Sequence, residues 1–178
     1  MHRTLSVVIN ALGFQAAWWA CIVGAGHGFD REAIVFCVIL AVLHLRISKH
    51  RWPECQLGLF AVLLGVVVDS LLQALSVIRF AGAALEPLSP FWLWTLWGMF
   101  ALTLNASLAF LKGQPLIVSA ALGLLFGPAT YYAGTNLGAA ELDVTPVRML
   151  ALGTAWAIAM PLLVVIAQRT NSITKDLS

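Results

Sequence analysis

The residue best placed to do chemistry in this chain is Asp69, the single acid within a long apolar stretch. That stretch runs from Gln56 to Arg79 and reads QLGLFAVLLGVVVDSLLQALSVIR. A carboxylate inside a hydrocarbon layer costs free energy, so it normally faces a protein interior or a water-filled cavity. In such a site it can act as a general acid or base. We therefore expect Asp69 to mark the centre of a buried polar site.

Two amides are the best candidate partners for this acid. Gln73 lies four residues after Asp69, on the same side of a helix. Asn105 lies in the stretch TLNASLAFLKG and shares a helical face with small residues, so it should point toward other helices. We predict Asp69 and Asn105 as catalytic candidates, with Gln73 orienting the acid. Both have a structural alternative, because buried acids and amides also hold helices together.

Gln73 and three further side chains are weaker candidates for binding a substrate. Tyr131 lies in a row of glycines along its own segment. Arg79 ends the Asp69 stretch, where it can meet a phosphate head group or simply extend to the membrane surface. His44 lies near the end of an apolar segment, a position more typical of an interfacial residue than of a base.

The sequence contains no pattern for a metal or an organic cofactor. Cys21, Cys37 and Cys55 have no metal-ligand spacing, and we interpret them as free, small hydrophobic residues. The GxSxG, HExxH, GxGxxG and GxxxxGK[ST] motifs are absent from the sequence. We therefore predict neither a metal nor a cofactor.

Composition identifies the class of protein that positions these residues. Of the 178 residues, 61% are hydrophobic and 10% are charged, and the mean hydropathy is +0.91. A soluble domain carries about 25% charged residues. The net charge of +2, without a basic run, also argues against a nucleic-acid partner. The chain is therefore expected to be a membrane protein.

The apolar segments predict an all-α bundle of about six transmembrane helices in a single domain, residues 1–178. A helix of about 20 residues crosses the hydrocarbon core of a bilayer. The predicted spans are residues 5–24, 33–47, 57–78, 91–111, 115–137 and 146–167. Trp92, Trp94 and Trp97 open the fourth span, which is typical of an interfacial aromatic belt.

The lysines and arginines of the loops predict the orientation. With the N-terminus inside, seven of them lie on the cytoplasmic side and three outside. The seven are Arg3, Arg46, Lys49, Arg51, Lys112, Arg169 and Lys175, and the three are Arg31, Arg79 and Arg148. Cytoplasmic loops carry the excess of positive charge, so we predict both termini in the cytoplasm.

The Asp69 segment is predicted to have two faces. Small and polar residues share one side of the helix: Gly58, Gly65, Asp69, Gln73 and Ser76. Larger apolar residues fall on the opposite side and are expected to face lipid: Phe60, Leu64, Val67, Leu71 and Ile78.

Four sequence patches, taken together, give a family resemblance. They are Asn10 with Gly13-Phe14-Gln15 and Trp18-Trp19-Ala20-Cys21; Asp69-Ser70-Leu71-Leu72; Thr103-Leu104-Asn105-Ala106-Ser107-Leu108; and Gly127-Pro128 with Tyr131 and Gly134. The set resembles a family of small uncharacterised proteobacterial inner-membrane proteins, known as a domain of unknown function. The resemblance implies a multi-pass protein of the bacterial inner (cytoplasmic) membrane. It also implies a link to lipid modification or envelope stress, because the family's genes often lie near cyclopropane-fatty-acid-synthase-like and flavin amine-oxidase-like genes. It implies no catalytic residue.

Three functions fit these observations. The first is modification or handling of membrane lipids around Asp69. The second is a small proton-coupled permease with Asp69 as the proton site. The third is a non-enzymatic partner subunit of a lipid-modifying enzyme. The expected partners are membrane lipids, and either such an enzyme or a second copy of the chain.

Overall fold

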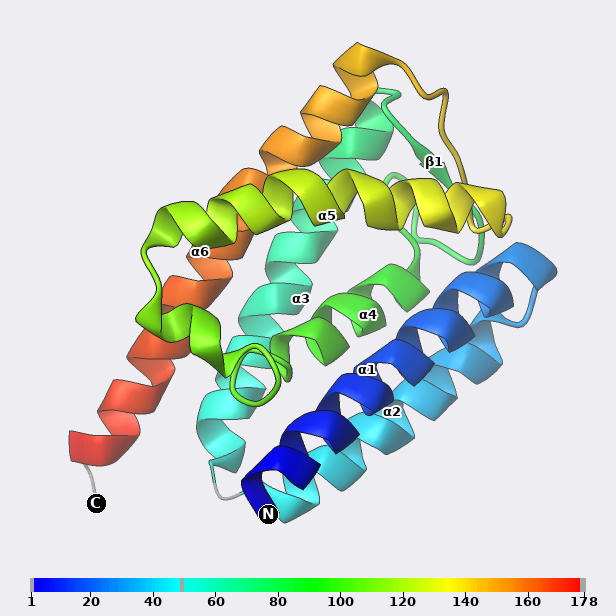
Figure 1. Cartoon of the computed structure of the whole chain (residues 1–178). Coiled ribbons are helices and arrows are strands. Elements are labelled where there is room, and N and C mark those ends of the chain that lie inside the picture. Colours follow the sequence, from blue (N-terminus) through cyan, green and yellow to red (C-terminus); the bar gives the residue numbers. More distant parts are fainter. Residues whose placement is uncertain (1, 49, 177–178) are drawn as a thin grey trace.

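The computed structural model describes residues 2–48 and 50–176, which form six α-helices, one short 3₁₀ helix and one pair of short strands (Figure 1). In chain order these are α1 (His2–His27), α2 (Asp30–Ile47), α3 (Arg51–Ala74), β1 (Arg79–Phe80), α4 (Phe91–Ala101), the 3₁₀ helix η1 (Ala109–Gly113), α5 (Leu116–Asn136), β2 (Ala140–Glu141) and α6 (Pro146–Asp176). The predicted all-α class is confirmed. Lys49, counted above for orientation, lies outside the described residues.

Four of the described helices are long and apolar enough to cross a membrane. They are residues Thr4–His27 of α1, Arg51–Ala74, Leu116–Asn136 and Pro146–Thr170 of α6. The other two predicted spans differ from these. The helix α2 carries Asp30, Arg31, Glu32 and Arg46 within its 18 residues. The helix α4 has 11 residues, or about 17 Å of rise, against about 30 Å of hydrocarbon. The chain is a membrane protein, and the count of six spans stays a prediction.

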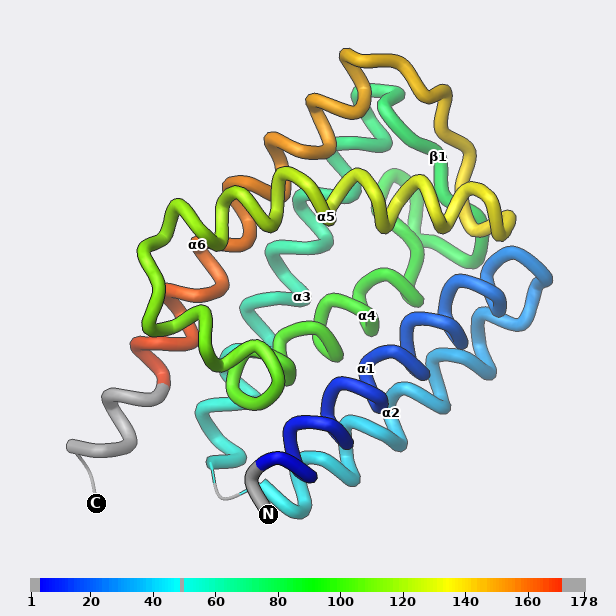
Figure 2. Tube along the Cα trace, viewed as in Figure 1, coloured from blue at the N-terminus to red at the C-terminus, as the bar shows by residue number. Residues whose placement is uncertain are grey.

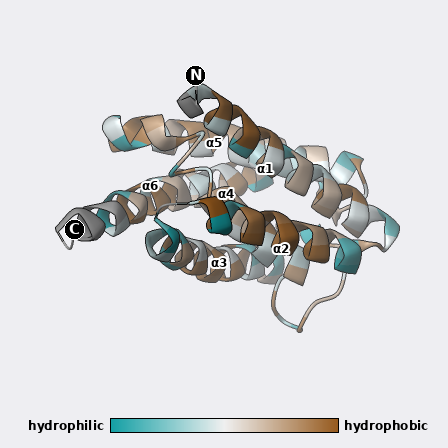
Figure 3. Ribbon diagram, turned by 90° about the horizontal axis from the view of Figure 1, so that it is seen from below, coloured by the Kyte–Doolittle hydropathy of each residue, from teal (hydrophilic) through white to brown (hydrophobic). Residues whose placement is uncertain are grey.

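The surface of the protein is apolar and several polar groups are buried, which is the reverse of a soluble fold. Large apolar side chains such as Val35, Ile39 and Leu43 of α2 are exposed, while Asp69 and Thr103 are buried. Figure 3 shows hydrophobic residues along the helices, with hydrophilic ones mainly at helix ends and connections. Exposed apolar patches of this extent mark contact with a membrane or a partner.

The predicted faces of α3 are confirmed in part. Its buried line is Leu57, Ala61, Gly65, Asp69 and Leu72, spaced three and four residues apart. Val67 and Leu71 are exposed, as predicted. Two predictions at the end of the segment are wrong, because α3 stops at Ala74 and Ser76 takes a positive φ of 56°. As a result Ile78 is buried and Ser76 is exposed.

The connections lie at two ends of the molecule. The hairpin of α1 and α2 runs antiparallel (Figure 2), and it contacts α4. The start of α1, the α2–α3 and α4–α5 connections and the end of α6 share one end (Figure 1). At the other end β1 pairs antiparallel with β2, and Ala83 donates its backbone N–H to Asp30 over 3.1 Å. Successive connections thus alternate between the two ends, while the six-span topology and the cytoplasmic termini stay predictions.

The fourth predicted span is not one continuous helix. The α-helix ends at Ala101, and residues 102–108 form successive turns before η1. Most backbone hydrogen bonds there span three residues instead of four. The Leu104 N–H donates to the Ala101 carbonyl, and the Ala106 N–H donates to the Thr103 carbonyl. Serine, threonine and asparagine favour such a change, because their side chains compete for backbone groups. The prediction of one helix over 91–111 therefore fails at its second half.

Asn10 of α1 holds this irregular segment in place. Its Nδ2 donates to the Leu102 carbonyl over 3.3 Å, and its Oδ1 accepts from the Ser107 backbone N–H and hydroxyl over 3.2 and 2.7 Å. Irregular backbone within a membrane needs such partners, because lipid offers no hydrogen bonds.

The packing of α3 against α4 gives a first prediction. A Cβ at Gly65 would overlap the indole ring of Trp97, whereas Gly58 on the same helix has no atom within 4 Å of its Cβ position. We expect Gly65→Ala to lower the free energy of unfolding by about 1–3 kcal/mol through overpacking. The matched control, Gly58→Ala, should be neutral or slightly stabilising. Thermal unfolding in detergent, followed by circular dichroism, measures the stability of both variants. Equal unfolding midpoints for Gly65→Ala and Gly58→Ala would contradict the close contact between Gly65 and Trp97.

Candidate functional site

The carboxylate of Asp69 lies at the junction of three helices. The side chain has 0% exposure. Its Oδ1 accepts a hydrogen bond from the Tyr131 hydroxyl of α5 over 2.5 Å, and its Oδ2 accepts one from the Trp97 indole N–H of α4 over 2.8 Å. Both carboxylate oxygens are therefore engaged. Asp69, on α3, ties α4 and α5 to its own helix.

The helix α6 joins the same group through Trp156. Its ring stacks on Trp97 with a centroid separation of 4.6 Å and an interplanar angle of 13°. It also meets the Tyr131 ring edge-on at 6.3 Å. The Trp156 indole N–H is buried and donates no hydrogen bond to any of the described residues. We call Asp69, Trp97, Tyr131 and Trp156 the polar junction.

Glycines one helical turn earlier make room for this junction. Gly65 precedes Asp69 by four residues and lies under the Trp97 ring. Gly127 precedes Tyr131 by four residues, and a Cβ there would be 2.5 Å from Cγ of Trp156. Residues four apart share a helix face, so each glycine lets an indole reach the polar group beside it. The glycines of α5 thus have a packing role that also builds the site.

A large apolar cavity lies beside the junction. Its volume is about 640 Å³, and α1, α4, α5 and α6 all contribute to its lining. Aromatic rings form much of the wall, among them Phe14, Trp18 and Phe100. Trp97, Tyr131 and Trp156 also line it, whereas Asp69 does not. The acid therefore acts on the cavity only through its hydrogen-bond partners.

Gln73 and Arg79 lie in a second, polar cavity of about 260 Å³ near the start of α6. Glu141, Asp143 and Arg148 share its lining. Arg79 lies 3.9 Å from Glu141 with both side chains largely exposed, and Arg148 pairs with Asp143. Gln73 makes no hydrogen bond to Asp69, so no direct contact supports its predicted role of orienting the acid.

Asn105 and His44 also belong to a different group. Lys112 Nζ donates to Asn105 Oδ1 over 2.8 Å, and His44 Nε2 lies 3.0 Å from Glu54 Oε2. Burial lowers the pKa of the Lys112 ammonium, and the neighbouring Glu54 carboxylate opposes that shift. These contacts lie at the end of the molecule where α3 begins. The structure thus brings Asp69 together with Tyr131, and places Asn105, His44, Gln73 and Arg79 elsewhere.

Helical periodicity does not predict the two indoles of the site, Trp97 and Trp156. Trp97 was interpreted as part of an interfacial belt, but it is buried and bonded to Asp69. Trp92, assigned to the same belt, is buried as well and donates to the Ala81 carbonyl over 2.8 Å. A usable signal was present, because an indole N–H is a donor that a buried acid needs. The two indoles are the part of the site that helical periodicity alone does not reveal.

The chain belongs to the DUF2878 family, described as proteins of unknown function, which matches residues 7–162. The matched range includes all four residues of the polar junction. No curated protein and no solved structure matches the chain. The predicted resemblance to a domain of unknown function is confirmed to this extent, and the family description supplies no activity.

Removing one donor from the buried carboxylate gives a second prediction. Tyr131→Phe leaves Asp69 Oδ1 without its bond, so we expect a loss of about 1–3 kcal/mol in the free energy of unfolding. The neighbouring Tyr132 is exposed, and Tyr132→Phe is the matched control, expected to change little. Thermal unfolding in detergent measures both variants.

The double variant Asp69→Leu/Tyr131→Phe should lose less than the sum of its single variants, because leucine has no acceptor and both changes therefore remove the same bond. Additive losses would show that the bond contributes nothing.

Proposed function

We propose that this member of the DUF2878 family binds the acyl chain of a membrane lipid in the cavity between α1, α4, α5 and α6. The observation that carries the proposal is the cavity itself, with about 640 Å³ of largely aromatic and aliphatic lining inside a membrane protein. Binding sites for small molecules are typically about 300–1,000 Å³, apolar, with a few polar groups. An acyl chain suits such a lining, and lipid is the solvent around the exposed helices.

Selectivity in this proposal comes from shape and from a few polar groups. Transfer from lipid into an apolar cavity gains no hydrophobic free energy, so packing and hydrogen bonds must favour the bound state. Gln15, Thr130 and Tyr131 are the polar side chains of the lining that can meet a carbonyl or hydroxyl of the lipid. The indole rings provide flat surfaces on which a chain packs closely.

The proposal gives Asp69 a positioning role in place of the catalytic role that the sequence suggested. A direct role as general acid or base conflicts with its full burial and two bonded oxygens. In the proposal it is a positioning residue that fixes the orientation of Tyr131, a residue of the cavity lining. Asn105, Gln73, Arg79 and His44 keep their predicted roles only as proposals, since none of them lines this cavity.

The proposed activity is handling of a membrane lipid: holding it, moving it or presenting it to a lipid-modifying enzyme. The proposed partners are membrane lipids, and either that enzyme or a second copy of this chain. The proposed location is the bacterial inner membrane, with both termini in the cytoplasm.

A proton-coupled permease is the second candidate, favoured by the interrupted fourth span. Transporters often place broken helices beside their binding sites, and here the break follows Ala101. This candidate requires uptake or efflux that depends on the proton gradient. Lipid handling does not, so measuring flux with and without an uncoupler separates the two.

Photolabelling with a lipid tests the proposed function. A phospholipid carrying a diazirine in its acyl chain is added to membranes that contain the protein, and labelled peptides are identified by mass spectrometry. Ala133 lines the cavity, and Ala133→Phe should reduce labelling of the cavity walls about tenfold, a loss of about 1.4 kcal/mol. Leu125 lies on the same helix and is exposed, so Leu125→Phe is the matched control.

Labelling that is uniform over all lipid-exposed faces, and unaffected by Ala133→Phe, would refute a bound lipid. Whole-cell lipid analysis of deletion, wild-type and Tyr131→Phe strains, at equal protein level, then asks whether binding changes the lipid composition. A changed lipid in the deletion strain that Tyr131→Phe reproduces supports a role of the junction.

A further inference from the structure

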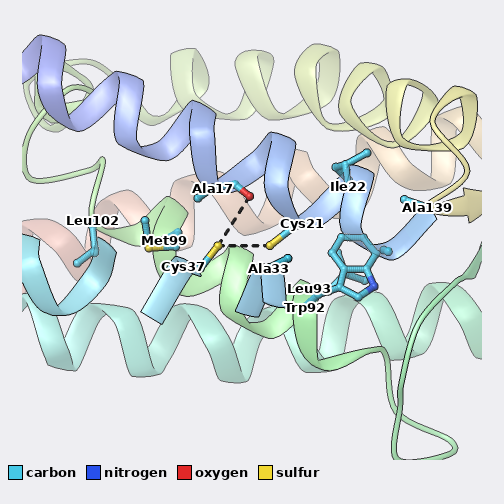
Figure 4. Packing of buried hydrophobic residues seen from close by; sticks show 11 residues of the cluster. Ala17, Cys21, Ile22, Ala33, Cys37, Trp92, Leu93, Met99, Leu102 and Ala139 are labelled. Carbon is cyan, nitrogen blue, oxygen red and sulfur yellow. Dashed lines mark hydrogen bonds between the residues drawn. The ribbon is translucent and has the colours of Figure 1, made fainter. Parts of the chain in front are cut away.

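The contact between α1 and α2 contains two thiols that play no part in the site above. The sulfur atoms of Cys21 on α1 and Cys37 on α2 are 3.5 Å apart. Both residues have 0% exposure. Figure 4 shows the two side chains pointing toward one another between the helices, with Ala17 and Ala33 beside them. Both cysteines are free and buried, as the sequence predicts, and they face each other across the contact between the two helices.

We propose that Cys21 and Cys37 form a site of reversible oxidation, in which a hydroperoxide joins them in a disulfide between α1 and α2. This proposal is independent of lipid binding in the cavity. It assigns a chemical reaction to the contact between α1 and α2.

The geometry favours this bond. A disulfide has a sulfur–sulfur length of about 2.05 Å, so the thiols need to approach by only about 1.5 Å. Small residues allow the two helices to lie close together: a Cβ at Gly24 would be 3.0 Å from the Cβ of Ala33. The Cys37 thiol also donates weakly to the Ala17 carbonyl, over 3.8 Å. That contact holds the Cys37 thiol in the α1–α2 contact beside Cys21.

The surroundings argue for a redox pair rather than a metal site. The cluster around the thiols consists of apolar residues, among them Ile22, Trp92 and Leu93. The part of the chain that the structure describes contains no group of three or more His, Cys, Asp or Glu that could hold a metal ion. Two thiols and an apolar shell are sufficient for a disulfide and insufficient for a metal.

The reaction balances with a hydroperoxide as the oxidant. One cysteine sulfur attacks the terminal oxygen of the peroxide, the O–O bond breaks, and the thiol becomes a sulfenic acid while the alcohol leaves with the thiol proton. The second sulfur attacks the sulfenic sulfur, the S–S bond forms, and water leaves with the second proton. Two thiols are oxidised by two electrons, and one hydroperoxide is reduced. Hydroperoxides are neutral and soluble in lipid, so they reach helices inside a bilayer.

The disulfide would act on the cavity through α1. The face of α1 that carries Phe14, Trp18 and Ile22 lines the cavity, while Cys21 faces α2. Oxidation would covalently fix this wall to α2.

The test uses wild-type protein in native membranes treated with cumene hydroperoxide. The membranes are then dissolved in sodium dodecyl sulfate with N-ethylmaleimide, so that buried thiols are blocked as well, and the digest is analysed by mass spectrometry without reduction. We expect one species in which the Cys21 and Cys37 peptides are joined with the loss of two hydrogens. The share of chains labelled at both positions should fall several-fold, and dithiothreitol should restore it.

Cys55 is the internal control, because its side chain is exposed on α3 and it is also a free thiol. It should be labelled before treatment and should not enter the cross-link. In Cys37→Ala the joined species should be absent, with Cys21 recovered as a thiol or sulfenic acid.

Recovery of Cys21 and Cys37 as labelled thiols, at a peroxide concentration that oxidises Cys55, would overturn the proposal. Their oxidation to sulfinic acids without a cross-link, or cross-linking between chains, would overturn it as well. The wild-type measurement alone decides the outcome, so a variant that fails to fold does not affect it.

Discussion

The burial of one carboxylate is the constraint on which the rest of this structure depends. An acid in a low-dielectric interior is costly unless donors replace the water that it lost. Asp69 receives an indole N–H from Trp97 and a hydroxyl from Tyr131, and these come from two other helices. Because each donor must point at its own oxygen of the same carboxylate, the rotation and depth of α3, α4 and α5 are fixed together. Trp156 adds α6 by stacking on Trp97.

The same aromatic groups that satisfy the acid form part of the wall of the large cavity. Trp97, Tyr131 and Trp156 each belong both to the polar junction and to the cavity lining. The protein thus places a polar group near an apolar cavity without exposing a charge to it. A hydroxyl held in this way is suited to orient one polar atom of a mainly apolar ligand. This arrangement is the reason for proposing a lipid chain as the ligand rather than direct proton transfer by Asp69.

The hairpin of α1 and α2 is joined to the other helices by separate interactions. Asn10 supports the irregular segment after α4, Asp30 accepts from the loop that precedes α4, and His44 meets Glu54 at the start of α3. Within the hairpin, small residues and the two thiols allow close approach. Because α1 also lines the cavity, these contacts fix the position of one cavity wall independently of the polar junction.

The sequence by itself determined the properties that depend on local composition and helical periodicity. These are the all-helical class, the membrane character, the burial of Asp69 beside Gly65 and the exposure of Val67 and Leu71. The tertiary structure alone decided the end of α4 at Ala101 and the partners of Asn105 and His44. It also decided the meeting of Trp97 and Tyr131 at one acid. A helical wheel assumes an unbroken helix and gives no rotation relative to other helices, whereas these features depend on long-range packing. Contacts between residues far apart in sequence therefore lie beyond what periodicity can show.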